Sequence, residues 1–178
     1  GLLLLILKQP NLSTAALMGL TLWMVALAAG LRWRSLLGTA LAGSLLGTAS
    51  ILINEYQRIR VVSFLDPWND PMGDGYQLVQ SLLAIGSGGW MGQGYGLSTQ
   101  KLQYLPIQST DFIYAVFAEE FGFVGSVLLL LFLMLVAWVG LRVALRCRSN
   151  QARLVAIGCT TILVGQSILN IAVASGAM

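Results

Sequence analysis

Long uncharged runs, made mostly of apolar residues, alternate with short polar segments along this chain. Each run has about 20 residues or more, the length that a helix needs to cross the apolar core of a bilayer. The four complete runs are Gln9–Leu31, Ser35–Asn54, Phe121–Leu141 and Leu154–Met178. The apolar residues before Lys8 look like the end of a further span. The pattern therefore predicts part of a larger polytopic membrane protein.

Basic residues predict which side each loop faces. Two short segments between spans carry arginines and no carboxylate: Arg32 and Arg34 in one, and Arg142, Arg146, Arg148 and Arg153 in the other. Loops rich in Arg and Lys stay in the cytoplasm, so these segments are predicted to lie inside. All seven carboxylates fall between Glu55 and Glu120, on the opposite side. Because an ionised group is costly in hydrocarbon, we expect water, substrate and chemistry to meet in that stretch.

The fold class that follows is all-α: a polytopic transmembrane helix bundle with a large extracytoplasmic loop that contains short amphipathic helices. We expect one membrane domain over residues 1–178. Its spans are predicted at about 1–7 (partial), 12–31, 35–54, 112–141 and 154–175, with the loop at 55–111. A structureless connection longer than about 15 residues is uncommon in compact domains and is usually functional.

The loop contains three segments of different character. Asp66–Gly75 has two Asp-Pro steps and two glycines, so its aspartates are interpreted first as turn formers. Tyr76–Ile85 has helical spacing and predicts a short amphipathic helix. We expect Leu78, Val79, Leu82 and Leu83 on its apolar face, and Gln77, Gln80 and Ser81 on its polar face. Gly86–Gly96 holds six glycines and no GxGxxG, which indicates either close backbone approach to a ligand or plain flexibility.

Composition excludes several kinds of chemistry. The sequence has no histidine, which removes Ser-His-Asp and Cys-His catalysis and argues against a structural zinc site. Cys147 and Cys159 form no CxxC pair, and no disulfide is expected between them. Ser98–Lys101 matches the S-x-x-K of penicillin-interacting enzymes, but the partner motifs of those enzymes are missing. No nucleic-acid partner is expected.

The acids near the end of the loop differ in context. Asp111 follows Ser109-Thr110 and precedes an aromatic run. It is either the N-cap of the next helix or a partly desolvated carboxylate suited to general-base catalysis. Of Glu119 and Glu120, we expect one to face the bundle interior, because paired carboxylates facing lipid would be costly.

The remaining candidates are substrate contacts. Lys101 is a cation suited to phosphate, and so is the pair Arg58 and Arg60. Gln80 and Glu120 complete the predicted set. Three turn acids lie on the same side of the membrane, but their spacing identifies no metal site, so the metal ligands stay unassigned.

Two stretches of the sequence resemble one known family. They are FLDPWNDPMGDGYQLVQSLLAIGSGGWMGQGYG and STQKLQYLPIQSTDFIYAVFAEEFGFVG. Both are similar to the large extracytoplasmic loop and following helix of the SEDS family, which includes FtsW, RodA and SpoVE. The resemblance covers essentially the whole chain and is most specific over Asp66–Gly125. It implies a protein of about ten spans, of which this chain holds part of the fifth and the sixth to ninth.

The resemblance implies a peptidoglycan glycosyltransferase of the bacterial plasma membrane that polymerises lipid II in cell division or cell-shape maintenance. The family moves a disaccharide-pentapeptide from undecaprenyl pyrophosphate onto a growing glycan strand. Its catalytic carboxylate falls on Asp111, and Lys101 or the Arg58/Arg60 pair would meet the pyrophosphate. A divalent cation, Mg²⁺ or Mn²⁺, could serve as a cofactor. Implied partners are lipid II, the glycan strand, membrane lipids, a class B penicillin-binding transpeptidase, and division or elongation proteins.

The sequence departs from the family at two places. Asn11 and Ser13 stand where the family usually has Asp and Gly, and the unusual QPNLST favours the FtsW branch. The family's Gly/Pro-rich segment after the ninth span is absent, so this stretch alone is expected to be inactive.

Two other functions compete with the glycosyltransferase. One is a flippase or transporter of lipid-linked precursors, which polar groups such as Gln166 and Asn170 within a span would suit. Interhelical hydrogen bonds explain those two residues equally well. The other is a non-catalytic division scaffold, which leaves the clustered carboxylates without a purpose.

Overall fold

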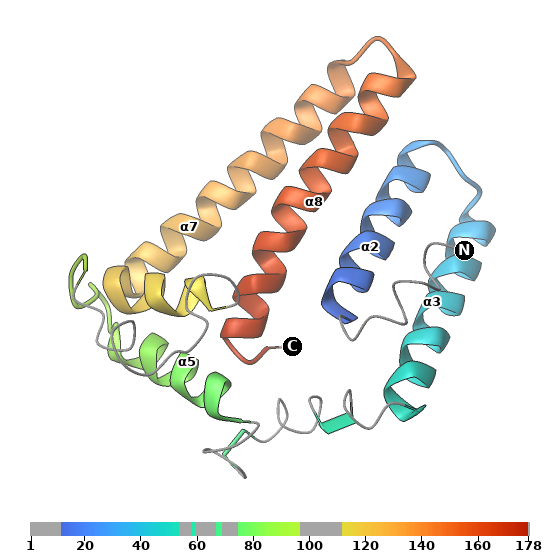
Figure 1. Ribbon diagram of the computed structural model, residues 1–178. Helices are drawn as coiled ribbons and strands as arrows, with labels where there is room; N and C mark the ends of the chain where they lie inside the picture. The colour runs from blue at the N-terminus through green and yellow to red at the C-terminus, as the bar shows by residue number, and fades with distance from the viewer. Residues whose placement is uncertain (1–11, 54–57, 60–66, 69–74, 97–111, 178) are drawn as a thin grey trace. The chain divides into compact units, whose positions relative to one another are not determined.

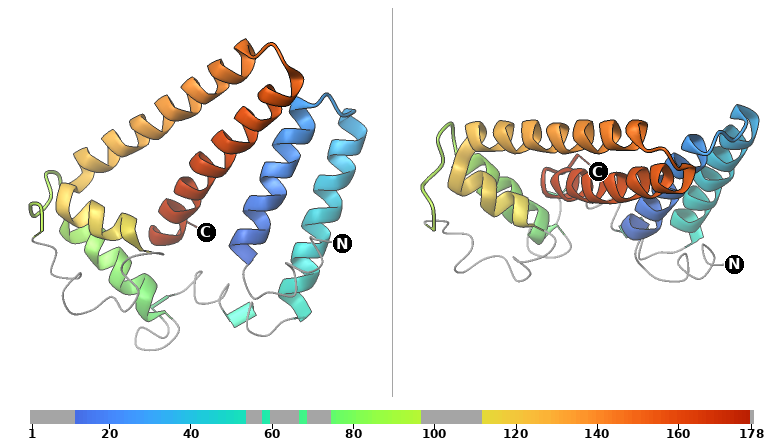
Figure 2. Two further views of the ribbon diagram at one scale, coloured as in Figure 1. Left: turned by 45° about the horizontal axis from the view of Figure 1, so that its top comes forward. Right: turned by 90° about the horizontal axis from the view of Figure 1, so that it is seen from above.

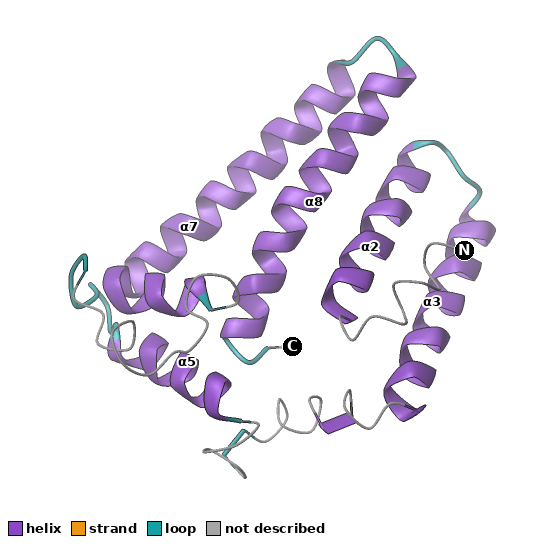
Figure 3. Cartoon of the chain, in the orientation of Figure 1, coloured by secondary structure: helices purple, strands orange, loops and turns teal. Residues whose placement is uncertain are grey.

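The computed structural model describes residues 12–53, 58–59, 67–68, 75–96 and 112–177. Throughout these ranges the regular structure is helical, which confirms the all-α prediction (Figures 1 and 3). The helices are α2 (Leu12–Ala28), α3 (Trp33–Ile53), α5 (Tyr76–Ser87), α7 (Ile113–Arg146) and α8 (Asn150–Ala174). The bounds of α2, α3 and α8 lie within a few residues of the apolar runs, whereas α7 extends beyond the run Phe121–Leu141 at both ends. Whether each helix crosses a membrane stays a prediction.

The chain forms two compact units, and α7 and α8 each contribute to both. The first unit comprises Gly1–Arg58 and Met134–Gln166, and the second comprises Ile59–Leu133 and Ser167–Met178. The arginine-rich hairpin between α7 and α8 therefore belongs to the first unit. The segment that carries the candidate site residues belongs mainly to the second.

In the first unit, α2 and α3 form an antiparallel hairpin (Figure 2). Gly30, with φ of +83°, ends α2 in the left-handed conformation that glycine adopts without strain. Its N–H donates to Leu27 O (3.1 Å), and the Leu31 N–H donates to Ala26 O (3.2 Å), the paired bonds that satisfy the last carbonyls of a helix. The Trp23 indole N–H then donates to Leu36 O (3.1 Å) and ties α2 to α3.

Contacts with small residues bring α8 close to its neighbours in the first unit. A Cβ on Gly140 of α7 would overlap the side chain of Thr160, and one on Gly158 would touch Val25 of α2. Near its start, α8 also contacts the last residue of α2, because Arg153 Nη2 donates to Ala28 O at 3.2 Å. Glycines at such crossings allow apolar helices to approach closely where hydrophobicity alone gives no attraction.

Large apolar side chains cover the outer surfaces of these helices. Among the described residues, α7 and α8 are long and apolar enough to cross a membrane, and Thr14–Ala28 is a shorter apolar helix. Exposed examples on α7 are Leu128, Leu131, Phe132 and Leu135, each more than half accessible. A helix that is apolar on all sides and uncovered is suited to contact with lipid rather than water.

Candidate functional site

The first component of the site is α5, which confirms the predicted amphipathic helix and extends it to Ser87. Its buried residues are Leu78, Val79, Ser81 and Ala84. The prediction that Ser81 belongs to the polar face is wrong, because this side chain is fully buried. Ser81 lies three residues after Leu78 and three before Ala84, so helical geometry places it on the covered stripe. Leu83, predicted to be covered, is 47% exposed.

Ser81 is buried because it joins α5 to the end of α8. Its hydroxyl donates to Ala174 O at 2.6 Å. Ala174 is the last residue of α8, where a carbonyl has no partner from its own helix. The Ser81 hydroxyl therefore satisfies the last carbonyl of α8 within a contact that is otherwise apolar. Next to it, Gly176 follows α8 with φ of +68°, and a Cβ added there would touch Leu78 and Leu82.

The second component is a break in α7 at Gly122. This residue has φ of 66° and ψ of −162°, which divides the element into a short helix at 113–121 and a long one at 123–146. Figure 1 shows the short part turned away from the axis of the long part. The predicted span at 112–141 is thus not one continuous helix. The uncharged run that begins at Phe121 coincides instead with the start of the long part.

The glycine-rich segment after α5 supplies the hydrogen bonds that the break removes. The N–H groups of Gln93 and Gly94 donate to the carbonyls of Glu119 (2.9 Å) and Glu120 (3.2 Å), at the end of the short helix. In the other direction, Phe123 N donates to Gly89 O (2.9 Å) and Val124 N to Trp90 O (3.2 Å). Both helix ends are therefore capped by one segment, so the break leaves these backbone groups satisfied.

Three glycines make this pairing possible. A Cβ on Gly88 would overlap the carbonyl of Ala118, and one on Gly92 would overlap the carbonyl of Glu120. A Cβ on Gly122 would overlap the backbone of Met91 and Gly92. The two meanings offered for Gly86–Gly96 were close backbone approach to a ligand and plain flexibility. The structure shows close backbone approach to the protein's own helix instead, and approach to a ligand stays a prediction.

The residue after Asp111 is fixed in the core of the second unit. Phe112 packs with Ala84 of α5, Ala115 of α7 and Ala174 of α8. Burying such a ring contributes about 1.5–3 kcal/mol. Its carbonyl accepts from Ala115 N (3.0 Å) and Val116 N (3.5 Å), which is the role of an N-cap residue. The N-cap position of α7 is thus Phe112, and Asp111 precedes it.

The candidate residues can now be placed. Asp111, Lys101 and Arg60 lie outside the described residues, and so do the turn aspartates. Glu120 is buried at 7% exposure, and Gln80 on α5 is half-buried; both belong to the second unit. Arg58 is exposed and belongs to the first unit.

The structure buries both carboxylates of the Glu119–Glu120 pair, where the sequence predicted one. Glu119 has no exposed surface and Glu120 has 7%. The glycine-rich segment lies against the backbone of this pair, since a side chain added at Gly88 would also meet the Glu119 Cα. Within the described ranges no group of three His, Cys, Asp or Glu could hold a metal ion, so the divalent cation stays a prediction.

Comparison with known proteins assigns the family. A family model described as "Cell cycle protein", which covers FtsW, RodA and SpoVE, matches residues 2–178. The chain belongs to this family. The loop motifs predicted this family and QPNLST favoured its FtsW branch; an FtsW-like membership is confirmed. Membership, together with the long apolar helices, identifies a membrane protein.

Individual relatives agree with the FtsW-like expectation. A probable peptidoglycan glycosyltransferase FtsW of Synechocystis is 62% identical over 173 residues, which are 97% of this chain and 44% of that protein. A putative FtsW of Cyanophora paradoxa is 52% identical over 96% of this chain and 43% of its own length. Stage V sporulation protein E of Bacillus subtilis is 40% identical over 97% of this chain and 47% of its own length. The chain thus spans less than half the length of the curated relatives it matches.

Proposed function

We propose that the protein to which this chain belongs is a peptidoglycan glycosyltransferase that polymerises lipid II. The observation that carries the proposal is the 62% identity, over 97% of the chain, to a relative named as a probable FtsW glycosyltransferase. The proposed base, Asp111, lies within the residues that the family model matches. The described structure supports the proposal through the residues that follow Asp111: Phe112 is buried, and the break in α7 is capped.

In the proposed reaction Asp111 acts as general base. It removes the proton from the attacking sugar hydroxyl while that oxygen forms a bond to the anomeric carbon of the second sugar. The bond from this carbon to the lipid pyrophosphate breaks, and the pyrophosphate leaves with the electron pair. The N-cap position of Phe112 supports this assignment, because helix capping then does not account for the carboxylate at Asp111.

Charge stabilisation is assigned to the cations of the loop. Lys101, Arg58 and Arg60 would neutralise the departing pyrophosphate, since fixed cations are most effective where negative charge develops. Gln80 and Glu120 are proposed as further substrate contacts. A Mg²⁺ or Mn²⁺ ion bound by loop acids would supply additional charge, although the described residues contain no ligand cluster that fits one.

We place the protein in the bacterial plasma membrane, with residues 55–111 on the extracytoplasmic face where the glycan is assembled. Lipid II and the growing strand are its substrates. A class B penicillin-binding transpeptidase is the proposed protein partner, because new glycan must be cross-linked, and division or elongation proteins would recruit both enzymes.

The test compares two Asp-to-Asn variants of the full-length protein. Asp111→Asn keeps the size and hydrogen-bonding oxygen of the side chain but cannot accept a proton. We expect polymerisation of purified lipid II to fall by about 100- to 10,000-fold. The matched control is Asp70→Asn, which keeps turn geometry in the loop and should retain most activity.

Expression and thermal stability of both variants must match the parent protein. Activity of Asp111→Asn within a few-fold of the parent would return Asp111 to a structural role. A loss at Asp70 as deep as that at Asp111 would show a direct electrostatic role for the turn acids.

A further inference from the structure

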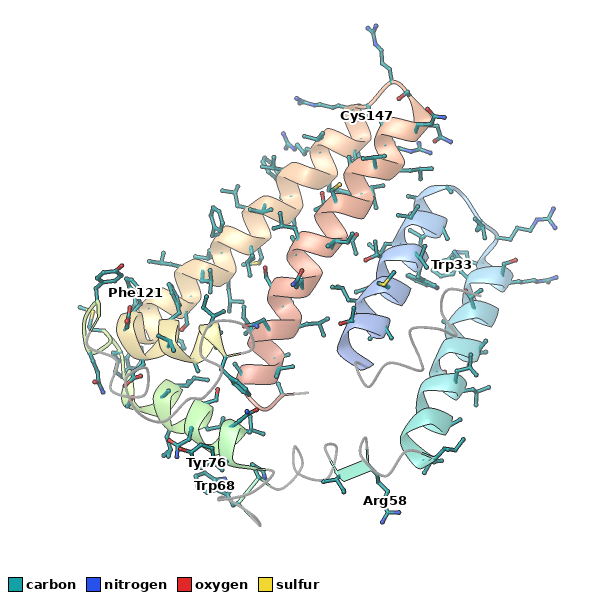
Figure 4. All side chains as sticks on the ribbon, viewed as in Figure 1. Trp33, Arg58, Trp68, Tyr76, Phe121 and Cys147 are labelled. Atoms are coloured by element: carbon teal, nitrogen blue, oxygen red, sulfur yellow. The ribbon has the colours of Figure 1, made fainter. Side chains whose placement is uncertain are left out.

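The second unit carries an exposed cluster of large side chains around the α7 break. Its members, called here the aromatic patch, are Trp90, Met91, Tyr95, Phe121 and Phe123. Met91 and Tyr95 are more than 80% exposed, and Trp90 is 74% exposed. Phe121 projects at the bend of α7 (Figure 4). Such a cluster is costly in water unless another apolar phase covers it.

The patch is held in place rather than left on a loose loop. The Trp90 ring meets the Phe123 ring edge-on at 5.2 Å between centroids, and the Trp90 carbonyl accepts from Val124 N. The Tyr95 ring lies 6.3 Å from that of Phe121, which in turn stacks on Phe117 at 4.7 Å. Trp90 is thus held against the start of the long part of α7, and Tyr95 against the end of the short part.

The surface next to the patch indicates what covers it. From Phe123 the exposed apolar side chains continue along α7 through Val124, Val127, Leu128 and Leu131. These belong to a helix suited to cross a membrane in a protein of a membrane family. The patch is continuous with that apolar surface and lies at its end, beside the break in α7.

The chemistry of the patch matches the boundary between lipid headgroups and acyl chains. Trp and Tyr combine an apolar ring with a polar tip and are enriched at that depth. Residues 86–96 contain no charged side chain, so the segment could enter this layer without burying a charge. A docking site for a charged, water-soluble partner would be expected to carry ionic groups at its rim.

We propose that the aromatic patch inserts into the headgroup–acyl boundary of the bilayer and anchors the glycine-rich segment and the α7 break at that depth. The anchor is independent of catalysis by Asp111. It assigns a role to exposed residues that the proposed reaction does not use. It also explains why the broken helix is capped from the side by a segment rich in Trp, Met and Tyr.

The experiment measures the depth of single labels in the full-length protein. Trp90→Cys or Met91→Cys is introduced into a protein whose other cysteines, Cys147 and Cys159 included, are replaced. The new thiol is labelled with the fluorophore NBD, and the protein is reconstituted in phosphatidylglycerol/phosphatidylethanolamine nanodiscs. Quenching is measured with nitroxide-bearing lipids and with aqueous iodide. Gln93→Cys is the matched control, because Gln93 is exposed, polar and on the same segment.

We expect nitroxide lipids to quench the label at position 90 or 91 at least twofold more than the label at position 93, and iodide to show the reverse order. Strong iodide quenching at position 90 or 91, equal to that at 93, would overturn the proposal in favour of a water-exposed surface. Protection from both quenchers would also overturn it, because the patch would then be covered by protein. Position 91 keeps the test usable if loss of the Trp90 ring disturbs folding.

Discussion

Gly92 and Gly122 lie so close that a side chain on either would overlap backbone atoms. A Cβ at Gly122 would overlap the Gly92 nitrogen, and one at Gly92 would overlap the Glu120 carbonyl next to the break. This contact lets one segment bond to both ends of the broken helix. Irregular backbone at membrane depth is tolerated only where its polar groups find partners in the protein. The glycines are therefore required for the break, and the break places the short helix, with Phe112 at its start, against α5.

The contact between Gly88 and the short helix gives the first prediction. Gly88→Ala should destabilise the full-length protein by about 1–3 kcal/mol, because the new methyl group meets the Ala118 carbonyl, which cannot move without disturbing α7. Gly86→Ala, two residues earlier, has open space for its methyl group and sits inside α5. It should be neutral or stabilise by up to about 1 kcal/mol. Thermal unfolding in detergent checks the order of the two variants, and equal midpoints would contradict the contact.

The second prediction concerns the bond between α5 and α8. Ser81→Ala removes the donor to Ala174 O and leaves that buried carbonyl unsatisfied, which costs about 1–3 kcal/mol. Ser87→Ala is the comparison, because the Ser87 hydroxyl donates only within its own helix, to Ala84 O at 2.8 Å. We expect a lower unfolding temperature for Ser81→Ala than for Ser87→Ala. The reverse order would mean that the hydroxyl contributes little to holding the two helices together.

Ser81 also shows where prediction from the sequence ends. Periodicity was enough to predict α5, because apolar residues recur at helical spacing over 76–85. Polarity then assigned Ser81 to solvent, although its position between Leu78 and Ala84 placed it on the covered stripe. The side chain is buried where its hydroxyl donates to Ala174 O, and this acceptor lies 93 residues further along the chain. No local pattern contains that partner.

The break at Gly122 also depends on partners that lie far away in the sequence. Hydropathy predicted apolar sequence from Phe121 onward, and that part of α7 is helical as expected. The break itself depends on bonds from Gly89–Gly94, a segment whose glycines were ambiguous on their own. The sequence contained one signal. A glycine-rich segment without charge, Gly86–Gly96, is followed later in the chain by a further glycine, Gly122, which comes shortly after two carboxylates. Read together, these features indicate backbone contact more readily than either does alone.

A third prediction concerns Arg153, which links α8 to the end of α2. Its Nη2 donates to Ala28 O at 3.2 Å and to Asn150 Oδ1 at 2.6 Å. A cation there also interacts favourably with the negative end of the α2 dipole. Arg153→Gln should destabilise by about 1–2 kcal/mol. Arg148→Gln changes the net charge equally at an exposed position of the hairpin and should have little effect. Unfolding midpoints that fall equally in both variants would assign the loss to charge alone.

The last prediction is the orientation of the chain. Six arginines and no carboxylate lie in the two segments predicted to be cytoplasmic, whereas the carboxylates lie in and just after the loop predicted to be outside. A reversed chain would place the arginine-rich hairpin across the membrane, against the bias that retains such loops in the cytoplasm. Five of these six arginines are exposed, and Arg153 is partly buried. The exposed side chains can therefore meet water or lipid headgroups on the cytoplasmic side.

Single cysteines in intact cells measure this orientation directly. Gln93→Cys reports on the glycine-rich segment and Ser149→Cys on the hairpin between α7 and α8; both positions are exposed. In a protein that otherwise lacks cysteine, a membrane-impermeant maleimide should label position 93 in whole cells. It should label position 149 only after the cells are permeabilised. The candidate base belongs to the same loop as position 93, so labelling of 149 but not of 93 in whole cells would place that loop in the cytoplasm. That result would contradict the proposal that the protein polymerises glycan on the extracytoplasmic face.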